Sequence, residues 1–339
     1  MSDSPATPTL TLKSHVFRRE REAGWLALEH LAEKIRKHGL RSLTADELAR
    51  LPMLYRGAVS SLSVARAIAL DRHLLLYLED LALRGFLLVY GPRRSWHAGV
   101  AHFFREGFPA AARTARWHIL AALLCIVAGT AAGFMLAGAD EAWIATLIPA
   151  GMSEGRGVAS TRESLLNNEL FAPWPGWQES FGVFASFLFQ HNTVVGILCF
   201  GLGAAAGIPT AALLIYQGLT FGAFLALHAN RGLLIDCLGW VSIHGITEFG
   251  AIALCGAGGF FMAEKMLLPG RYSRTDSLAM HGQTASRLAV GAMLLFMLAA
   301  ILEGGLRQLV ASTPWRFVIG FGVGAVWITY LALPRRTRA

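Results

Sequence analysis

The stretch from Cys237 to Ala263 is long and apolar enough to cross a lipid bilayer, yet it contains a glutamate and a histidine. Glu248 is its only formally charged side chain, and His244 lies four residues earlier. On a helix this spacing places both side chains on one face, about one turn apart. An ionisable group at membrane depth costs about 2.5–3.5 kcal/mol on insertion scales, so it usually faces a partner or water. The stretch therefore predicts a membrane protein with a polar interior.

The composition agrees with a membrane protein. Hydrophobic residues make up 54% of the chain, charged residues 15%, and the mean hydropathy is +0.48, whereas about a quarter of the residues of soluble domains are charged. The net charge is +8, and the basic residues gather in the N-terminal third, one internal loop and the C-terminal tail. This is the pattern of cytoplasmic faces of a bilayer protein. No nucleic-acid-binding motif accompanies it, so no nucleic-acid partner is expected.

Residues 1–94 predict a cytoplasmic helical domain. The first twenty residues are polar and charged, unlike a secretory signal peptide. Thr44 and Glu47 form a capping box that opens a helix, and Pro52 is expected to interrupt or restart that helix. The leucine-rich stretch 72–90 contains Glu79, Asp80 and Arg84, which favours a helix of a soluble bundle over a membrane span.

Residues 95–116 predict an interfacial amphipathic segment. Apolar and aromatic side chains are accompanied there by His97, His102 and Arg105. Such a composition is typical of a helix that lies on the membrane surface. An ordinary helix of the bundle is the alternative.

Residues 117–339 predict an all-α transmembrane bundle. Six segments have about the length that a spanning helix needs: 117–136, 181–208, 210–229, 238–263, 288–306 and 317–333. The second is long enough for a short interfacial helix plus a span, with a break expected near Asn192. The predicted fold class is thus a polytopic transmembrane helical bundle of about six spans with an N-terminal cytoplasmic helical domain.

Basic residues predict the orientation. They cluster before the first span, in the loop after the fourth, and at the chain end in Arg335, Arg336 and Arg338, and such clusters favour the cytoplasmic side. The chain is then expected to lie in the bacterial plasma membrane with both termini in the cytoplasm. The loop 138–179 is expected on the external side. A second capping-box pattern, Ser160 with Glu163, predicts a short helix in that loop. The run Trp174-Pro175-Gly176-Trp177 resembles an aromatic anchor at the membrane interface.

Polar side chains within the spans gather toward the external half of the membrane. The predicted intramembrane cluster comprises His191, Asn192, Gln217, His228, His244, Glu248 and Glu303. We expect His244, Glu248 and Glu303 to lie together, because their inferred depths coincide and an unpaired buried carboxylate is costly. Imidazole and carboxylate groups could hold a metal ion, relay a proton or line a solute pathway. Interhelical hydrogen bonding is the alternative.

No motif in the sequence indicates catalysis or a bound cofactor. The His244–Glu248 pair lacks the second histidine of the HExxH metalloprotease motif, and the phosphate-binding GxxxxGK[ST] is absent from the sequence. The cysteines lie in or beside apolar segments without CxxC spacing, so we expect buried thiols at Cys125, Cys199, Cys237 and Cys255. No catalytic residue and no cofactor are therefore predicted.

Several of these motifs resemble the stage II sporulation protein M family. The resemblance extends from about Trp117 to the C-terminus, and Leu54-Tyr55-Arg56 resembles the N-terminal region of the family's longer members. Gln217-Gly218 replaces an Asn-Gly that is common in the family. The motifs that carry the resemblance are Gln190-His191-Asn192, the glycine-rich run to Gly207, Gln217-Gly218-x-x-x-Gly222, His244-Gly245-x-x-Glu248, and Glu303.

The resemblance implies a polytopic membrane protein and brings no transport or enzymatic activity with it. The family's namesake works with peptidoglycan-degrading partners in engulfment. The expected function is accordingly a non-enzymatic component of an envelope-remodelling or membrane-associated assembly, with protein partners bound through the cytoplasmic domain. The alternative is a channel or transporter for an ion or small solute that uses the buried His/Glu cluster.

Glycine pairs at small-xxx-small spacing allow helices to approach closely, and four such pairs occur in the predicted spans. This number favours self-association as a homodimer. The last span, with Gly320, Gly322 and Gly324, is one predicted contact. The competing contact is the face of Leu74, Leu78 and Leu81 on the helix predicted over 72–90.

Overall fold

The computed structural model describes residues 13–67, 72–90, 96–149, 153, 155–173 and 181–333. The secondary structure of these residues is helical, without a strand. The chain divides into two compact units, 1–96 and 97–339. The helical secondary structure of the described residues confirms the predicted all-α class.

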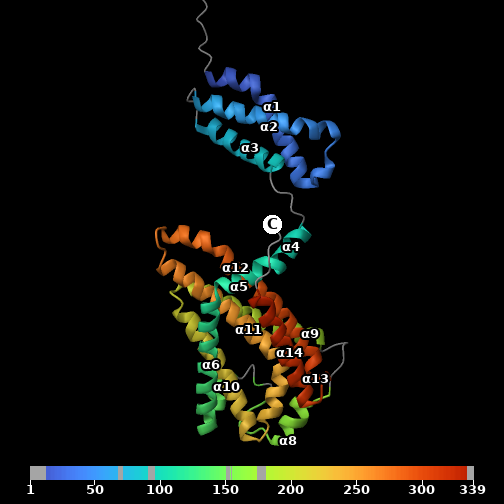
Figure 1. The fold of residues 1–339 in the computed structure, drawn as a ribbon, viewed down its shortest axis with the longest axis vertical. Coiled ribbons are helices and arrows are strands. Elements are labelled where there is room, and N and C mark those ends of the chain that lie inside the picture. Colours follow the sequence, from blue (N-terminus) through green and yellow to red (C-terminus); the bar gives the residue numbers. More distant parts are fainter. Residues whose placement is uncertain are drawn as a thin grey trace, which may run out of the picture. The chain divides into compact units, whose positions relative to one another are not determined.

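The N-terminal unit is a set of three long helices (Figure 1): α1 (Lys13–His38), α2 (Ala45–Ala67) and α3 (Arg72–Tyr90), with the short 3₁₀ turn η1 (Leu40–Ser42) before α2. The predicted capping box is present, because Thr44 N donates to Glu47 Oε2 at 2.8 Å and Glu47 N donates to Thr44 Oγ1 at 3.2 Å. The shared core of the three helices includes Trp25, Leu28, Leu51, Leu78 and Leu81.

The predicted interruption at Pro52 is wrong, since α2 is continuous through this residue. Proline removes one backbone hydrogen bond from a helix interior. Burial of Leu51 and Ala58 on either side of the proline stabilises the unbroken helix.

The second unit contains six helices that are long and apolar enough to cross a membrane, as predicted. Two of them end in short irregular turns, η5 (Leu202–Ala204) after α9 and η6 (Leu302–Leu306) with α13 (Arg307–Leu309) after α12. The six helices are α6 (Arg116–Ala139), α9 (Phe181–Gly201), α10 (Ile208–Asn230), α11 (Leu234–Leu267), α12 (Arg274–Ile301) and α14 (Thr313–Ala332).

The predicted break near Asn192 is also wrong. α9 runs unbroken through this residue, and the chain turns later, at Gly207, whose φ of 76° suits a residue without a side chain. Asn192 is buried within the bundle, where its amide has a side-chain partner, so it does not compete with the helix backbone for hydrogen bonds.

α11 is the most buried of the six spans, with 67% of its most apolar window inside the bundle. Its neighbours include α9, α12 and α14, while α6 packs mainly on α10 (Figure 1). Because His244 and Glu248 lie on α11, the fold places both in the interior. Large apolar side chains such as Val127 on α6 and Phe321 on α14 are exposed, as lipid-facing positions of a membrane protein are.

The glycine pairs are used inside the chain. Gly129 and Gly133 on α6 face Gly218 and Gly222 on α10 so closely that a Cβ at any of the four would overlap backbone of the other helix. Gly320 of α14 similarly meets the backbone of α11. Small residues that let helix backbones touch are typical of membrane helix pairs.

Most residues of the two contacts predicted for a homodimer are occupied within the subunit. Gly320 and Gly324 face α11, whereas Gly322 has open space around it. On the other predicted contact, Leu74, Leu78 and Leu81 are buried in the core of the N-terminal unit. The homodimer stays a prediction, and of the residues that suggested it only Gly322 is left open.

The segment before the first span consists of α4 (Trp96–His102), the π-helical turn η2 (Phe103–Gly107) and α5 (Phe108–Thr114). Phe108 is buried, and its ring lies against Gly291 of α12, so α5 packs on the bundle. The placement of this segment at a membrane interface stays a prediction.

The segment between α6 and α9 carries three short elements: α7 (Ala142–Leu147), α8 (Arg162–Leu165) and the π-helical turn η4 (Leu166–Leu170). The predicted short helix is present, but its cap is Thr161 rather than Ser160, since Ser164 N donates to Thr161 Oγ1. Leu165 and Leu170 are buried in a core shared with α10 and α11. The run Trp174–Trp177 and the arginines after residue 333 lie outside the described residues.

Candidate functional site

Three ionisable side chains from two helices meet inside the bundle. His244 and Glu248 project from α11, and Glu303 projects from the π-helical turn η6. A ligating atom of each lies within 4.8 Å of the others, with His244 Nε2 at 3.8 Å from Glu303 Oε1. π-Helical turns inside α-helices frequently mark functional positions. The structure thus brings together the three residues that the sequence analysis expected to form one cluster.

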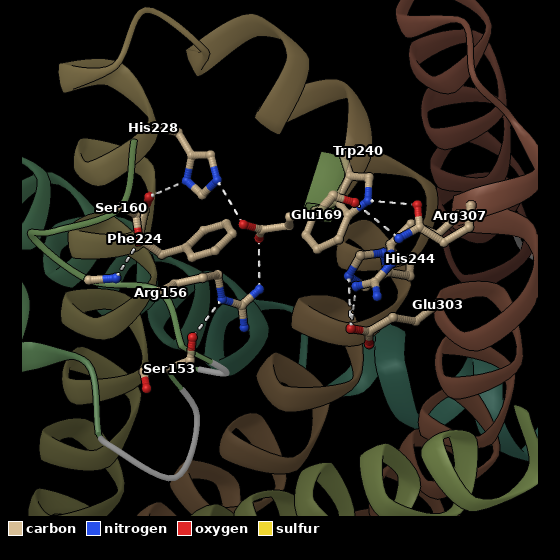
Figure 2. A network of polar contacts seen from close by, with 12 residues as sticks. Ser153, Arg156, Ser160, Glu169, Phe224, His228, Trp240, His244, Glu303 and Arg307 are labelled. Carbon is tan, nitrogen blue, oxygen red and sulfur yellow. Dashed lines mark hydrogen bonds and ion pairs between the residues drawn. The ribbon is translucent and has the colours of Figure 1, made fainter. Parts of the chain in front are cut away.

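Arg307 completes this cluster. Its Nη1 donates to Glu303 Oε1 at 2.7 Å, and its guanidinium lies 3.9 Å from the centre of the Trp240 ring. Figure 2 shows the side chains of His244, Glu303 and Arg307 directed toward one another beside Trp240. Arg307 was not predicted from the sequence, although its position four residues after Glu303 is the spacing of a helical ion pair.

The cluster borders a cavity of about 190 Å³, here called the chamber. Aromatic rings of Phe221, Phe224, Trp240 and Phe249 form much of its wall. The polar or charged side chains that line it are Arg156, His191, Asn192, Gln217, Thr220, His244, Glu248, Glu303 and Arg307. A concave, mostly apolar site with a few convergent polar groups is the usual form of a small-ligand site.

Six of the seven residues predicted for the intramembrane cluster line this chamber, and His228 does not. Asn192 lies within hydrogen-bonding reach of the Glu248 carboxylate. His191 stacks on Phe187 at a ring-centre distance of 6.2 Å. Helical depth was predictable from the sequence, whereas the rotation of His228 on α10 was not.

His228 belongs to a second polar group next to the chamber. It is fully buried, its Nε2 lies 3.4 Å from Glu169 Oε2, and its Nδ1 lies 2.9 Å from the Phe224 carbonyl oxygen. Arg156 pairs with the other oxygen of Glu169 at 2.7 Å. Burial raises the pKa of the Glu169 carboxyl, but His228 and Arg156 outweigh it, and the pKa is lowered overall.

A second cavity of about 160 Å³, here called the vestibule, adjoins the chamber on the side of the α6–α9 segment. Residues of that segment line it, among them Ser160, Ser164 and Asn168. Chamber and vestibule share Arg156, Trp240 and Arg307. In Figure 2, Glu169 lies between the His228–Arg156 group and the Trp240–Arg307 group.

The sequence analysis gave no signal for Arg156 and Glu169. Both belong to an irregular segment, where no periodicity relates side chains to the bundle. Gln308 connects this segment to the cluster, because its amide donates to the Glu169 carbonyl oxygen at 3.1 Å and accepts from Trp240 Nε1 at 3.4 Å.

The fold and the chamber define a polytopic α-helical membrane protein with charged residues in its interior. The family model for stage II sporulation protein M matches residues 121–306, more than half of the chain. The chain belongs to this family, and the match includes every residue of the predicted cluster. A second family model, described as a domain of unknown function (DUF8413), matches residues 15–91. No curated protein and no solved structure gave a significant match.

Proposed function

We propose that the membrane bundle binds a small cation or polar solute in the chamber and admits it through the vestibule. The observation that carries this proposal is that the two cavities lie side by side and share Arg156, Trp240 and Arg307 in their walls. Charged residues inside a membrane protein usually mark an ion or substrate pathway, because burying a charge at membrane depth is unfavourable and such residues are rare where they have no function. This is the channel or transporter function that was the alternative in the sequence analysis.

The orientation proposed from the basic residues places the vestibule outside the bacterial plasma membrane and the N-terminal unit in the cytoplasm. A ligand would then enter the vestibule from the external side. Arg156 and Arg307 would meet it between the two cavities. The chamber beyond them offers Glu248 and Glu303 to a cation, or the amides of Asn192 and Gln217 to a neutral polar solute.

The accessibility of Gln217 to a membrane-impermeant thiol reagent tests this proposal. In a chain whose native cysteines are replaced by alanine, Gln217→Cys should react with an external methanethiosulfonate cation, because this position lines the chamber. The matched control is Ala223→Cys on the same helix, which is fully buried in side-chain packing and should stay unmodified. Equal protection of both positions in intact cells would refute the proposed entry.

The chain's role as a non-enzymatic component of an envelope assembly is a second candidate function. It is supported by membership of the stage II sporulation protein M family and by the separate N-terminal unit. That unit exposes apolar side chains along α3, among them Leu83, Phe86, Leu87 and Tyr90. An exposed apolar face of this kind favours a protein partner.

Cross-linking in native membranes tests the second candidate. Leu83→Ser with Leu87→Ser should abolish the cross-linked species of the full chain. Leu48→Ser on α2 is the control, since Leu48 is exposed as well and lies on another helix. An unchanged set of cross-linked species in the α3 variant would contradict a partner at this face.

A further inference from the structure

One imidazole and two carboxylates converge in the chamber with the composition of a metal site. We infer that His244, Glu248 and Glu303 bind a divalent transition-metal ion. This inference rests on the chamber being a binding site, as proposed above, and it names the class of ligand. The three residues come from α11 and η6, so the site would join two helices that are separated in the sequence.

The separations of the ligating atoms suit an ion better than direct contact. Protein nitrogen and oxygen ligands lie about 2.0–2.2 Å from zinc, which places two ligands on one ion roughly 3–4 Å apart. His244 Nε2 and Glu303 Oε1 are 3.8 Å apart, within that range and too far for a hydrogen bond. The whole set, within 4.8 Å, needs only small side-chain rotations to close around an ion.

His244 provides an independent observation. The side chain lines the chamber, the residue is 5% exposed, and its Nδ1 atom has no hydrogen-bond partner among the described residues. A buried polar atom without a partner costs free energy, about 1–3 kcal/mol. The imidazole is therefore free to reorganise around an incoming ligand.

The charge balance also favours a cation. Two carboxylates, Glu248 and Glu303, lie near one guanidinium, that of Arg307, so these three side chains carry a net charge of −1 when all are ionised. Arg307 donates one hydrogen bond to Oε1 of Glu303, and the carboxylate keeps lone pairs for an ion. Carboxylates that bind metals are commonly held in place by a further hydrogen bond of this kind.

The ligand types narrow the choice of metal. Imidazole suits zinc, iron, copper and nickel, whereas carboxylates also suit manganese. One imidazole with two carboxylates therefore fits Zn²⁺, Fe²⁺ or Mn²⁺ better than Ca²⁺, which takes only oxygen ligands. Asn192 and Gln217 line the same chamber and offer amide oxygens as further ligands.

Cobalt binding to the full chain in detergent tests the inference. After treatment with a chelator, titration with Co²⁺ should give visible absorption bands that saturate at one ion per chain and are displaced by Zn²⁺. His244→Gln and Glu248→Gln should each weaken Co²⁺ binding by ~100-fold or more. His228→Gln is the matched control, because His228 is a buried histidine with a carboxylate partner outside the chamber, and its Co²⁺ affinity should stay unchanged.

Two results would overturn the inference: the absence of Co²⁺ bands in the wild-type chain, or bands of equal affinity in the His244→Gln and Glu248→Gln variants. The use of two variants guards against a folding defect in either, and elution as a single symmetric species establishes that each is folded. If Gln217→Cys reacts from outside but no Co²⁺ binds, the proposed metal site is refuted, whereas the proposed entry of a ligand into the chamber is supported. If Gln217→Cys is protected, both proposals fail.

Discussion

Arg307→Met should destabilise the membrane bundle strongly, because it removes the only guanidinium that contacts the Glu303 carboxylate among the described residues. Arg307 Nη1 lies 2.7 Å from Glu303 Oε1, and the two side chains are 9% and 11% exposed. Removing one partner of a buried ion pair typically costs about 3–5 kcal/mol. The net charge of Glu248, Glu303 and residue 307 then becomes one unit more negative. Methionine preserves an apolar contact with Trp240.

The double variant Glu303→Gln/Arg307→Met separates lost charge compensation from lost packing. It returns the net charge of the group to its wild-type value, so much of the lost stability should be recovered. Lys265→Met is the control, since its pair with Glu264 at 2.6 Å is partly exposed and such pairs contribute about 1 kcal/mol or less.

A thiol-reactive fluorophore can follow unfolding, because Cys199, Cys237 and Cys255 are buried in the folded bundle. In chelator-containing buffer, the labelling equilibrium of Arg307→Met should shift by about 10²- to 4 × 10³-fold, which corresponds to about 3–5 kcal/mol at about 1.4 kcal/mol per tenfold change. A shift no larger than that of Lys265→Met would refute the reasoning, as would a double variant that is less stable than Arg307→Met.

Three further predictions follow from the packing, the orientation and the loop ion pairs. Gly222→Ala should lower the thermal unfolding midpoint despite the better helix propensity of alanine, because a Cβ there overlaps backbone of α6. Gly322 has open space around it, so Gly322→Ala should leave the midpoint unchanged or raise it. A lowered midpoint in both variants, or in neither, would contradict the α6–α10 packing. Cysteines introduced near Arg162 should be labelled from outside the cell and those near Arg274 should not, and the reverse pattern would overturn the orientation. The lowered pKa of Glu169 means that its ion pairs stabilise the fold above the ordinary glutamate value of about 4.3, and that this contribution is lost as the pH falls through the lowered pKa. Unfolding midpoints between about pH 3 and pH 7 should therefore fall less steeply in Glu169→Gln, and parallel profiles would count against these ion pairs.

The spans were predictable from the sequence because each is a continuous apolar segment, and the thickness of the bilayer sets the length that such a segment needs. The breaks within helices were less predictable. Asn192 and Pro52 both disfavour helix locally, yet their helices are continuous: Asn192 is itself buried along with Val195 and Cys199, and Pro52 lies between buried Leu51 and Ala58. Local propensity is a weak term beside tertiary packing.

The depth of the site residues in the membrane was predictable from the sequence. The direction in which each helix points its side chains was not, and neither were the residues that the α6–α9 segment adds. His244, Glu248 and Glu303 share a level in the bundle and meet, whereas His228, on α10, turns toward Glu169 instead. The rotation of a helix about its own axis depends on the helices packed against it, and these neighbours are not evident from a single sequence. Glu169 reaches the bundle from an irregular segment, where spacing along the chain does not predict side-chain position.

An experimental density map of the full chain in lipid nanodiscs tests most directly whether the buried polar residues form one chamber. We expect ligating atoms of His244, Glu248 and Glu303 to lie within 4.8 Å of one another, with Arg307 bound to Glu303 and the rings of Trp240 and Phe249 on the wall of the chamber. Carboxylates of Glu248 and Glu303 on opposite faces of the bundle, or a space filled by packed apolar side chains, would contradict this arrangement.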